Sequence, residues 1–390
     1  MGLLWRYLST LHLSSISNMS KRLFIISGEP SGDLHGANLV KELKAQDPNI
    51  DIACWGGDKM KSQGATVLKH IDELAFMGFV EVLANIFTII KNFRLCQIHI
   101  KSFNPDAVVL IDYPGFNLRM AEHIYKMGIP SHYYISPQIW AWKESRAKKI
   151  KAFVKRVFVI LPFEQEFYNK HGINAEYVGH PLLDEIQQFD FDKSAFCVKH
   201  QLDANKPIIA VLPGSRKQEI SKILPLINGL PSAFVDYQIV VSKVSWLREE
   251  LYHSLLNQGV AIVDGDTYKL IKNAEAAVIT SGTATLETAI IGTPEVVVYK
   301  ANALSVWLAR ILVKVKYISL VNLILDRMSI TELIQSDANT TALITELRSI
   351  LLGGDKREQI LNDYVELNAK LGAGGASKIV ASQLLKSLNQ

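Results

Sequence analysis

The chain has 390 residues, 48% of them hydrophobic and 21% charged, a composition typical of globular proteins with sizeable cores and not of disordered chains. This length predicts two or three domains. A formal net charge of +4 is too small to predict nucleic-acid binding, although it suits an anionic membrane surface or a phosphorylated substrate. Cys54, Cys96 and Cys197 have the spacing of neither a metal site nor a disulfide framework, which favours a reducing compartment.

Residues 1–20 are expected to be a leader outside the fold. Their apolar patch is interrupted by Arg6, Ser9 and His12, which weakens the case for a signal peptide. Met19 stands just before the first predicted strand, so we expect either a disordered leader or a start placed too early. Elsewhere no uninterrupted apolar run reaches the ~18 residues that a transmembrane helix needs.

The first predicted strand, 22–27, leads into a glycine-containing loop, 28–33, and then into a helix, 34–46. A strand, loop and helix start in this order form an anion-binding arrangement, because backbone amides and the helix dipole point into the loop. Glu29 and Asp33 are unusual in a loop that only binds phosphate. They suit proton transfer or sugar hydroxyls, and a simple capped turn is the alternative.

The apolar run 108–111 ends directly at Asp112, and the following Tyr113, Pro114 and Gly115 cannot continue a strand. This pattern predicts a buried parallel strand with Asp112 at its carboxyl end, where open α/β sheets bind ligands. A carboxylate there can accept a proton or bind a sugar hydroxyl. It can also cap the next turn, and the residues alone leave both roles open.

Between these strands, 76–100 predicts a helix whose apolar face is wider than one packing stripe requires. It is either buried on the sheet or contacts acyl chains or a membrane interface. A strand at 132–136 precedes an aromatic loop, 137–142, and a basic helix, 143–155, without an RNA-binding signature. His180 can be a ligand contact or an ordinary loop histidine. The alternation of strands and helices predicts a doubly wound parallel sheet.

The alternation restarts at 207 after a more polar stretch, which predicts a second α/β domain. The segment 280–285 is the strongest phosphate signal, because small and hydroxyl residues lie between a buried strand and a helix start. Glu287, one turn later, can accept hydrogen bonds from ribose hydroxyls. Arg216 can bond two phosphate oxygens or form a surface salt bridge of little energetic value. Helices are expected at 329–335, 339–352, 356–371 and 377–388.

Short motifs then recur in a specific order: SGEPSGD, MGFVEVL, IDYPGFN, SPQIWAW, LPFE, VGHPLLD, LPGSR, TSGTATLE and ISLVNLI. From about Lys21 to the C-terminus, this ordered set resembles the lipid-A-disaccharide synthases, the inverting glycosyltransferases of family 19. The resemblance implies an α/β protein of the GT-B fold, with two Rossmann-like, doubly wound domains facing across a cleft. The domains implied are 21–190 and 191–352, with helices in 353–390 packing back on the first domain.

The resemblance also implies a reaction. UDP-2,3-diacylglucosamine is the donor, and 2,3-diacylglucosamine 1-phosphate (lipid X) is the acceptor. The products are a β-1,6-linked disaccharide 1-phosphate, on the route to lipid A, and UDP. The enzyme is expected to need no metal or other cofactor and to lie peripherally on the cytoplasmic face of the inner membrane, while a homodimer is left open. The alternatives are another GT-B enzyme, such as a UDP-sugar 2-epimerase or a different lipid glycosyltransferase, and a non-catalytic nucleotide-binding protein.

Site residues follow from the matched motifs. Asp112 corresponds to the candidate base, with Glu29 and Asp33 as the other carboxylates considered. Val321 replaces the proline that many relatives have before Asn322, which suggests a less rigid loop there. The UDP-sugar contacts implied are Arg216, Thr280, Ser281, Gly282, Thr283, Ala284, Thr285, Glu287 and Asn322. The loop that lines the cleft from the first domain comprises Ser27, Gly28, Ser31 and Gly32. The acyl or membrane contacts implied are Met77, Phe79, Val82, Leu83 and Ile86.

Overall fold

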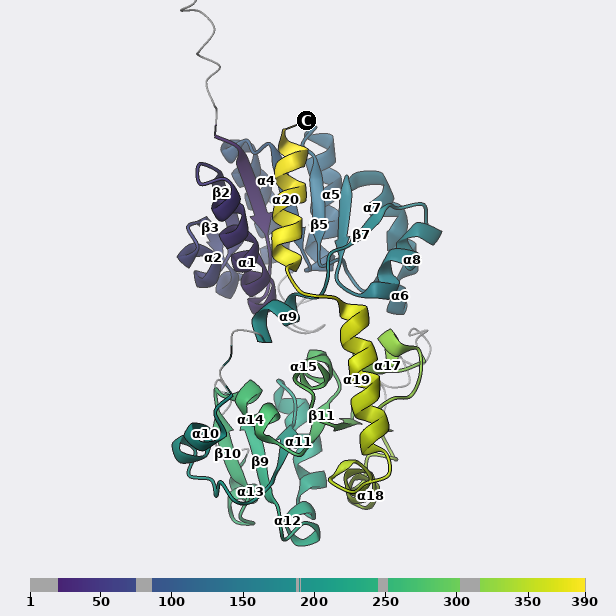
Figure 1. Cartoon of the computed structure of the whole chain (residues 1–390). Helices are drawn as coiled ribbons and strands as arrows, with labels where there is room; N and C mark the ends of the chain where they lie inside the picture. Colours follow the sequence, from purple (N-terminus) through teal and green to yellow (C-terminus); the bar gives the residue numbers. More distant parts are fainter. Residues whose placement is uncertain are drawn as a thin grey trace, which may run out of the picture.

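The structure is a computed structural model that describes residues 20–74, 86–186, 189, 191–244, 252–301 and 316–389. It contains two α/β domains stacked one above the other (Figure 1). Residues 1–19 of the expected leader lie outside the described residues, as do Met77, Phe79, Val82 and Leu83. Ile86 is the first residue of a helix, but its side chain is not described.

The described part of the first domain has a parallel sheet of seven strands in the order β3-β2-β1-β4-β5-β6-β7. The central strands are almost completely buried because helices cover both faces of the sheet. The strands are β1 (Arg22–Ile26), β2 (Asp51–Gly56), β3 (Thr66–His70), β4 (Ala107–Ile111), β5 (Ser131–Tyr134), β6 (Arg156–Val159) and β7 (Ala175–Tyr177).

Helices α4, α5 and α7 cover one face of this sheet, whereas α1 and α20 cover the other. The elements of this domain are α1 (Pro30–Gln46), α2 (Asp58–Ser62), η1 (Ile71–Glu73), α4 (Ile86–Phe103), α5 (Pro114–Lys126), α6 (Ile139–Trp142), η2 (Glu144–Arg146), α7 (Ala147–Phe153), α8 (Pro162–Lys170) and α9 (Pro181–Ile186).

The strand order reverses between β1 and β4, where Ile26 lies beside Leu110 in parallel register. The helices that follow β1 and β4 lie on opposite faces of the sheet. They leave a crevice between them at the carboxyl ends of these strands, where ligands usually bind in this architecture. Ser27 follows β1 and Asp112 follows β4, so the fold brings the two predicted segments to the same crevice.

The described part of the second domain repeats the plan with six parallel strands in the order β10-β9-β8-β11-β12-β13. Its strands are β8 (Ile208–Leu212), β9 (Gln238–Lys243), β10 (Ala261–Asp264), β11 (Ala276–Thr280), β12 (Glu295–Tyr299) and β13 (Glu332–Ile334). Its helices are α10 (Lys193–Lys199), α11 (Lys217–Ile227), α12 (Leu230–Ala233), α13 (His253–Leu256), α14 (Thr267–Asn273), α15 (Thr283–Ile291), α17 (Leu320–Leu325) and α18 (Thr340–Ile350).

The helix expected at 329–335 is wrong, because this segment contains the edge strand β13, which pairs in parallel with β12. Ile330 and Leu333 are buried and lie three residues apart. This spacing fits one turn of a helix as well as a short strand preceded by irregular backbone. Pairing with a neighbouring strand therefore decides the structure of a segment too short to specify it locally.

Two segments cross between the domains. Helix α20 (Ala376–Leu388) packs on α1 and the first sheet, as its place beside α1 in Figure 1 shows. Helix α19 (Arg357–Leu371) instead packs in the core of the second domain through Tyr364 and Leu367. The expectation that all of 353–390 packs on the first domain is therefore wrong for α19, because its apolar face meets α15, α17 and α18.

Helix α9 makes the other crossing. Its apolar residues Leu182, Leu183 and Ile186 belong to the core cluster of the second domain. The backbone N–H of Gly375, just before α20, donates to the Asp184 carboxylate of α9, so the two crossings are tied together. Within the described ranges, none of the helices combines the length and apolar character that spanning a bilayer requires.

Candidate functional site

Asp112 lies in a strained turn at the end of β4. Asp112 (φ 42°) and Tyr113 (φ 49°) both have left-handed backbone conformations, which cost non-glycine residues roughly 1–3 kcal/mol each. The main-chain carbonyl of Asp112 accepts hydrogen bonds from the Tyr133 hydroxyl (2.6 Å) and from Asn117 Nδ2 (2.8 Å). These contacts hold the backbone of the turn in its strained form.

The ring of Tyr113 joins this turn to the loop after β1. It stacks on Phe116 with a centroid separation of 5.4 Å. A Cβ atom on Gly28 would lie 2.6 Å from the same ring, so only glycine lets the loop approach this closely. Gly32 has a similar role, since a Cβ there would lie 2.9 Å from the Ser27 side chain.

The Asp112 carboxyl is a stronger base than an ordinary aspartate. Burial, followed by the negative charge of nearby Glu29, raises the pKa of Asp112 from 3.8 to about 6. Glu29 itself is exposed at the N-cap of α1. A carboxylate with such a pKa is ionised at neutral pH and still takes up a proton readily, as a general base must.

The other predicted polar residues of this region have structural contacts. Asp33 is buried, and its carboxylate accepts from the N–H groups of Gly57 (2.7 Å), Lys59 (3.1 Å) and Met60 (3.2 Å). The Asp33 carboxylate therefore caps the start of α2, and both of its oxygens already accept backbone hydrogen bonds. His180 is also buried, and its Nδ1 accepts from the Leu182 N–H at the start of α9 (3.2 Å). Ser31 lies exposed in the first turn of α1.

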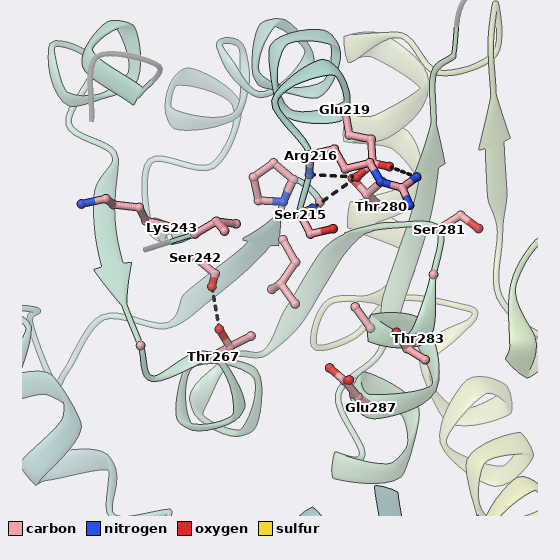
Figure 2. Close-up of a pocket in the computed structure, with 17 residues that line it drawn as sticks. Ser215, Arg216, Glu219, Ser242, Lys243, Thr267, Thr280, Ser281, Thr283 and Glu287 are labelled. Atoms are coloured by element: carbon pink, nitrogen blue, oxygen red, sulfur yellow. Dashed lines mark hydrogen bonds and ion pairs between the residues drawn. The ribbon is translucent and has the colours of Figure 1, made fainter. Parts of the chain in front are cut away.

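The second domain has a cavity of about 480 Å³ at the carboxyl ends of β8, β9, β10 and β11 (Figure 2). Ser242 and Lys243 lie on one side of it, and Thr283 and Glu287 lie on the other. The cavity thus occupies the crevice where this sheet reverses its strand order, between β8 and β11.

Several groups in this cavity suit a diphosphate. The Thr280 hydroxyl is buried without a hydrogen-bond partner among the described residues. The Arg216 side chain is 74% exposed, and among the described residues its guanidinium pairs with the half-buried Glu219 carboxylate at 3.6 Å. The same carboxylate accepts from the N–H groups of Ser215 (3.2 Å) and Arg216 (3.3 Å), so this loop already binds an anionic group at its amides (Figure 2).

Glu287 connects the cavity to the crossing helix α9. Burial, followed by the charge of Glu185 on α9, raises the pKa of Glu287 to about 7. The Tyr268 hydroxyl forms hydrogen bonds with both carboxyl groups. The cavity therefore shares a polar cluster with the segment that joins the domains.

Most of the UDP-sugar contacts inferred from the motifs line this cavity, namely Arg216, Thr280, Ser281, Gly282, Thr283, Ala284 and Glu287. Thr285 does not line it, because this residue is fully buried and its hydroxyl donates to the Gly282 carbonyl (2.9 Å). The sequence argument missed Ser242, Lys243, Gly265 and Thr267, which also line the cavity. Their signal is their place at the carboxyl end of β9, for Ser242 and Lys243, and just after β10, for Gly265 and Thr267.

Asn322 is fully buried and does not line the cavity. Its Nδ2 donates to the Ile330 carbonyl and to Glu332, both at 2.9 Å. Its Oδ1 accepts from the N–H groups of Ser329 (2.8 Å) and Ile330 (3.0 Å). The Asn322 amide therefore organises the turn between α17 and β13, and its inferred contact with UDP can only be indirect.

Replacing Asn322 with alanine is expected to lower the free energy of unfolding by about 2–4 kcal/mol, because the turn loses four buried hydrogen bonds. Urea unfolding measures this change. Asn339→Ala, which removes an exposed helix cap, is the control and should cost only about 1 kcal/mol. An Asn322→Ala protein that keeps its stability but loses UDP affinity would instead indicate direct contact with the nucleotide.

Among the described residues, no group of three or more His, Cys, Asp or Glu side chains is arranged to hold a metal ion.

Known structures with the same architecture include UDP-GlcNAc 2-epimerases. The enzyme from Neisseria meningitidis has a TM-score of 0.65 at 13% identity, with 94% of this chain and all of that chain covered. A putative enzyme from Listeria monocytogenes has a TM-score of 0.66 at 11% identity, with 95% and 97% covered. At these identities the likeness concerns the fold, which is that of GT-B enzymes with two Rossmann-like domains.

By sequence, the chain is far more similar to lipid-A-disaccharide synthases than to these epimerases. The lipid-A-disaccharide synthase of Syntrophus aciditrophicus is 37% identical over 375 residues, covering 94% of this chain and 97% of that protein. The synthase of Coxiella burnetii is 36% identical over 366 residues, with 93% and 97% covered. A family model described as lipid-A-disaccharide synthetase matches residues 23–383. The chain therefore belongs to the lipid-A-disaccharide synthase family of glycosyltransferases.

Proposed function

We propose that this chain transfers a 2,3-diacylglucosaminyl group from UDP to the 6-hydroxyl of 2,3-diacylglucosamine 1-phosphate. The products are the β-1,6-linked disaccharide 1-phosphate and UDP. The observation that carries the proposal is the family match over residues 23–383, which includes both Asp112 and the second-domain cavity. A carboxyl with a raised pKa in one domain and an anion-binding cavity in the other are the two parts that this transfer needs.

The donor is proposed to bind in the second-domain cavity. The Arg216 guanidinium, the amides at the start of α15 and the Thr280 hydroxyl can bond diphosphate oxygens there. The Glu287 carboxylate can accept hydrogen bonds from the ribose hydroxyls. The solved structures of UDP-GlcNAc 2-epimerases with bound UDP-GlcNAc support a sugar nucleotide as a ligand of this fold.

Asp112 is proposed to be the base. As its carboxylate takes the proton of the acceptor 6-hydroxyl, the 6-oxygen forms a bond to C1 of the donor sugar on the face opposite UDP. The C1–phosphate oxygen bond breaks, and its electron pair leaves with UDP, which converts an α-linked donor into a β-glycoside. Asp33 is less suited to this role, because its oxygens accept three backbone hydrogen bonds. Glu29 is assigned the secondary role of raising the pKa of Asp112.

The UDP-sugar is proposed to be a substrate that acts without a resident cofactor, with Arg216 and backbone amides opposing the charge of the leaving group. Peripheral binding to the cytoplasmic face of the inner membrane is also proposed. Its support is the exposed apolar side of α4, where Phe87 is 83%, Ile98 is 62% and Ile90 is 46% exposed.

One experiment separates the synthase from the epimerase alternative that the fold likeness raises. Purified protein is incubated with the diacyl UDP-sugar alone and with both substrates, and products are followed by mass spectrometry. Disaccharide 1-phosphate and UDP are expected in equal amounts, and only when both substrates are present. Conversion of the donor to its 2-epimer without acceptor would favour the epimerase. The absence of disaccharide with both substrates would disprove the synthase activity.

A further inference from the structure

A second cavity, of about 760 Å³, lies in the first domain between α4, α5 and α7. Much of its lining is apolar, with Ile89, Ile90 and Phe93 from α4 and Phe116 from α5. Phe93 and Phe116 meet edge to face at a centroid distance of 5.5 Å. Such a cavity can hold a hydrocarbon chain without losing hydrogen bonds, because few polar groups line this part of it.

One side of the same cavity is basic. Arg94 of α4, Arg119 of α5 and Lys149 of α7 line it, whereas Glu122 is the one carboxylate in the lining. Glu122 is already paired with Lys126 (2.9 Å) and lies 3.7 Å from Lys149. Neither Arg94 nor Arg119 forms an ion pair with a described residue, and both are exposed. Arg94 and Arg119 therefore present positive charge that no carboxylate of the described residues neutralises.

A fourth basic residue lies close by. Burial lowers the pKa of the Arg146 guanidinium, and the interaction with Tyr133 opposes this shift, whereas the charge of Arg119 adds to it. Like charges at close range repel one another, and an anion between them relieves the repulsion. This cluster thus favours an anionic group on the ligand, in addition to the apolar group that the other side of the cavity accepts.

The cavity is adjacent to the proposed base. Tyr113 lines it and directly follows Asp112 in the strained turn. Tyr113 therefore connects the lining of this cavity to the turn that carries Asp112.

We propose that this cavity is the acceptor subsite. Arg94, Arg119 and Lys149 bind the 1-phosphate, and one acyl chain lies along Ile90 and Phe93. The assignment rests on the proposed function, and it names which substrate occupies the cavity. The donor is the poorer candidate, because its phosphates have their own cavity in the second domain and its sugar carries no other anion.

The chemistry of the acceptor agrees with this orientation. A phosphate monoester carries about −1.5 to −2 charges at pH 7 and offers three acceptor oxygens, which suits arginine forks. The phosphate and the C6 hydroxymethyl group leave the glucosamine ring from C1 and C5, the two carbons that flank the ring oxygen. A phosphate held at the basic side of the cavity therefore keeps the 6-hydroxyl within the span of one sugar ring, and Tyr113 in the lining connects the cavity to the turn that carries Asp112.

The test uses the full chain with substrates in micelles of a neutral detergent, so that no anionic lipid is present. Arg94→Ala and Arg119→Ala are each expected to raise the KM for the acceptor about 10- to 100-fold and to leave the KM for the donor unchanged. With an acceptor that lacks the 1-phosphate, the wild-type enzyme should show the same rise in acceptor KM. The arginine variants should then raise this KM little further. Lys101→Ala, an exposed charge on α4 outside the cavity, is the matched control.

Equilibrium binding of the acceptor in the same micelles, without donor, separates the two proposals. In one outcome, the wild-type protein binds the acceptor, the arginine variants bind it weakly, and no disaccharide forms. This outcome supports the acceptor subsite and disproves the synthase activity. If disaccharide forms and the variants keep the wild-type acceptor KM, the subsite is wrong. A loss that appears only on vesicles containing phosphatidylglycerol, and not in neutral micelles, would assign the arginines to the membrane surface and also overturn the subsite.

Discussion

Replacing Asp112 with asparagine is expected to lower kcat by about 10²–10⁴-fold, because the acceptor hydroxyl loses its general base. Asparagine has nearly the same shape and tolerates the left-handed conformation that residue 112 adopts, so the turn should persist. The donor and acceptor KM values should therefore change little. The measurement is steady-state kinetics with each substrate varied in turn, and near-normal turnover would disprove the assignment.

The pH dependence gives a second measurement of the same assignment. A base must be unprotonated, so the rate should rise with pH through about 6, the pKa of Asp112, and then level off. Glu29 raises this pKa, so Glu29→Gln should move the rising limb to lower pH and leave the upper plateau largely intact. If Glu29→Gln instead lost activity at every pH, Glu29 would be the better candidate for the base.

The stability of Asp112→Asn distinguishes a catalytic carboxylate from a structural cap. Because the pKa of Asp112 in the folded protein lies above the ordinary aspartate value of 3.8, the folded protein holds this proton more tightly than the unfolded chain. The contribution of Asp112 to stability is therefore fully present below about pH 4, falls as the pH rises, and is lost above about pH 6. At pH 8 the variant should be more stable than the wild type by about 1–3 kcal/mol in urea unfolding, and near pH 4 the difference should vanish. A variant less stable than the wild type at pH 8 would indicate a cap.

The strands that carry the site could be predicted because their signal is local. Apolar runs such as 108–111 and 276–280 are buried on both faces of a parallel sheet, and the next residues must lie at the carboxyl edge. Asp112 and the segment from Thr280 to Glu287 were located in this way. In contrast, the edge strands β3, β7 and β13 were missed, because they are short and only partly buried and have no apolar run to reveal them.

Side-chain roles that depend on distant backbone could not be predicted. Asp33 accepts from amides 24 to 27 residues away, and only the packing of α2 beside α1 brings them together. The amide of Asn322 is occupied by a turn whose strand, β13, was itself predicted as a helix. The motif resemblance marked both positions as part of the site, but it could not distinguish contact with a ligand from support of the backbone.

The first-domain cavity could not be predicted for a related reason. Arg94, Arg119 and Lys149 belong to three different helices and lie 25 or more residues apart in the chain. On each helix alone such a residue resembles an ordinary solvated charge. Only the packing of α4, α5 and α7 gathers the positive charges beside Tyr113, where they acquire a common function.

Replacing Arg216 with alanine is the second large effect we expect. The UDP leaving group gains negative charge as the C1–oxygen bond breaks, and the Arg216 guanidinium, which lines the second-domain cavity, is proposed to oppose that charge. Loss of such a group should lower kcat by about 10²–10³-fold. Arg216→Lys should recover only part of the rate, because an ammonium group cannot bond two phosphate oxygens in the planar geometry of arginine. Turnover at saturating donor concentration measures the change in kcat, and calorimetry measures the affinity for UDP.

Stability provides the control for Arg216. Its ion pair with Glu219 is long and its guanidinium is exposed, so its removal should leave the free energy of unfolding nearly unchanged. Lys217→Ala, the neighbouring exposed charge outside the cavity, should keep both stability and turnover. If Arg216→Ala raised only the donor KM and left kcat intact, Arg216 would bind the diphosphate equally in the ground and transition states. If neither constant changed, its role would be limited to the surface ion pair, and the leaving group would depend on the amides of the α15 start and the Thr280 hydroxyl alone.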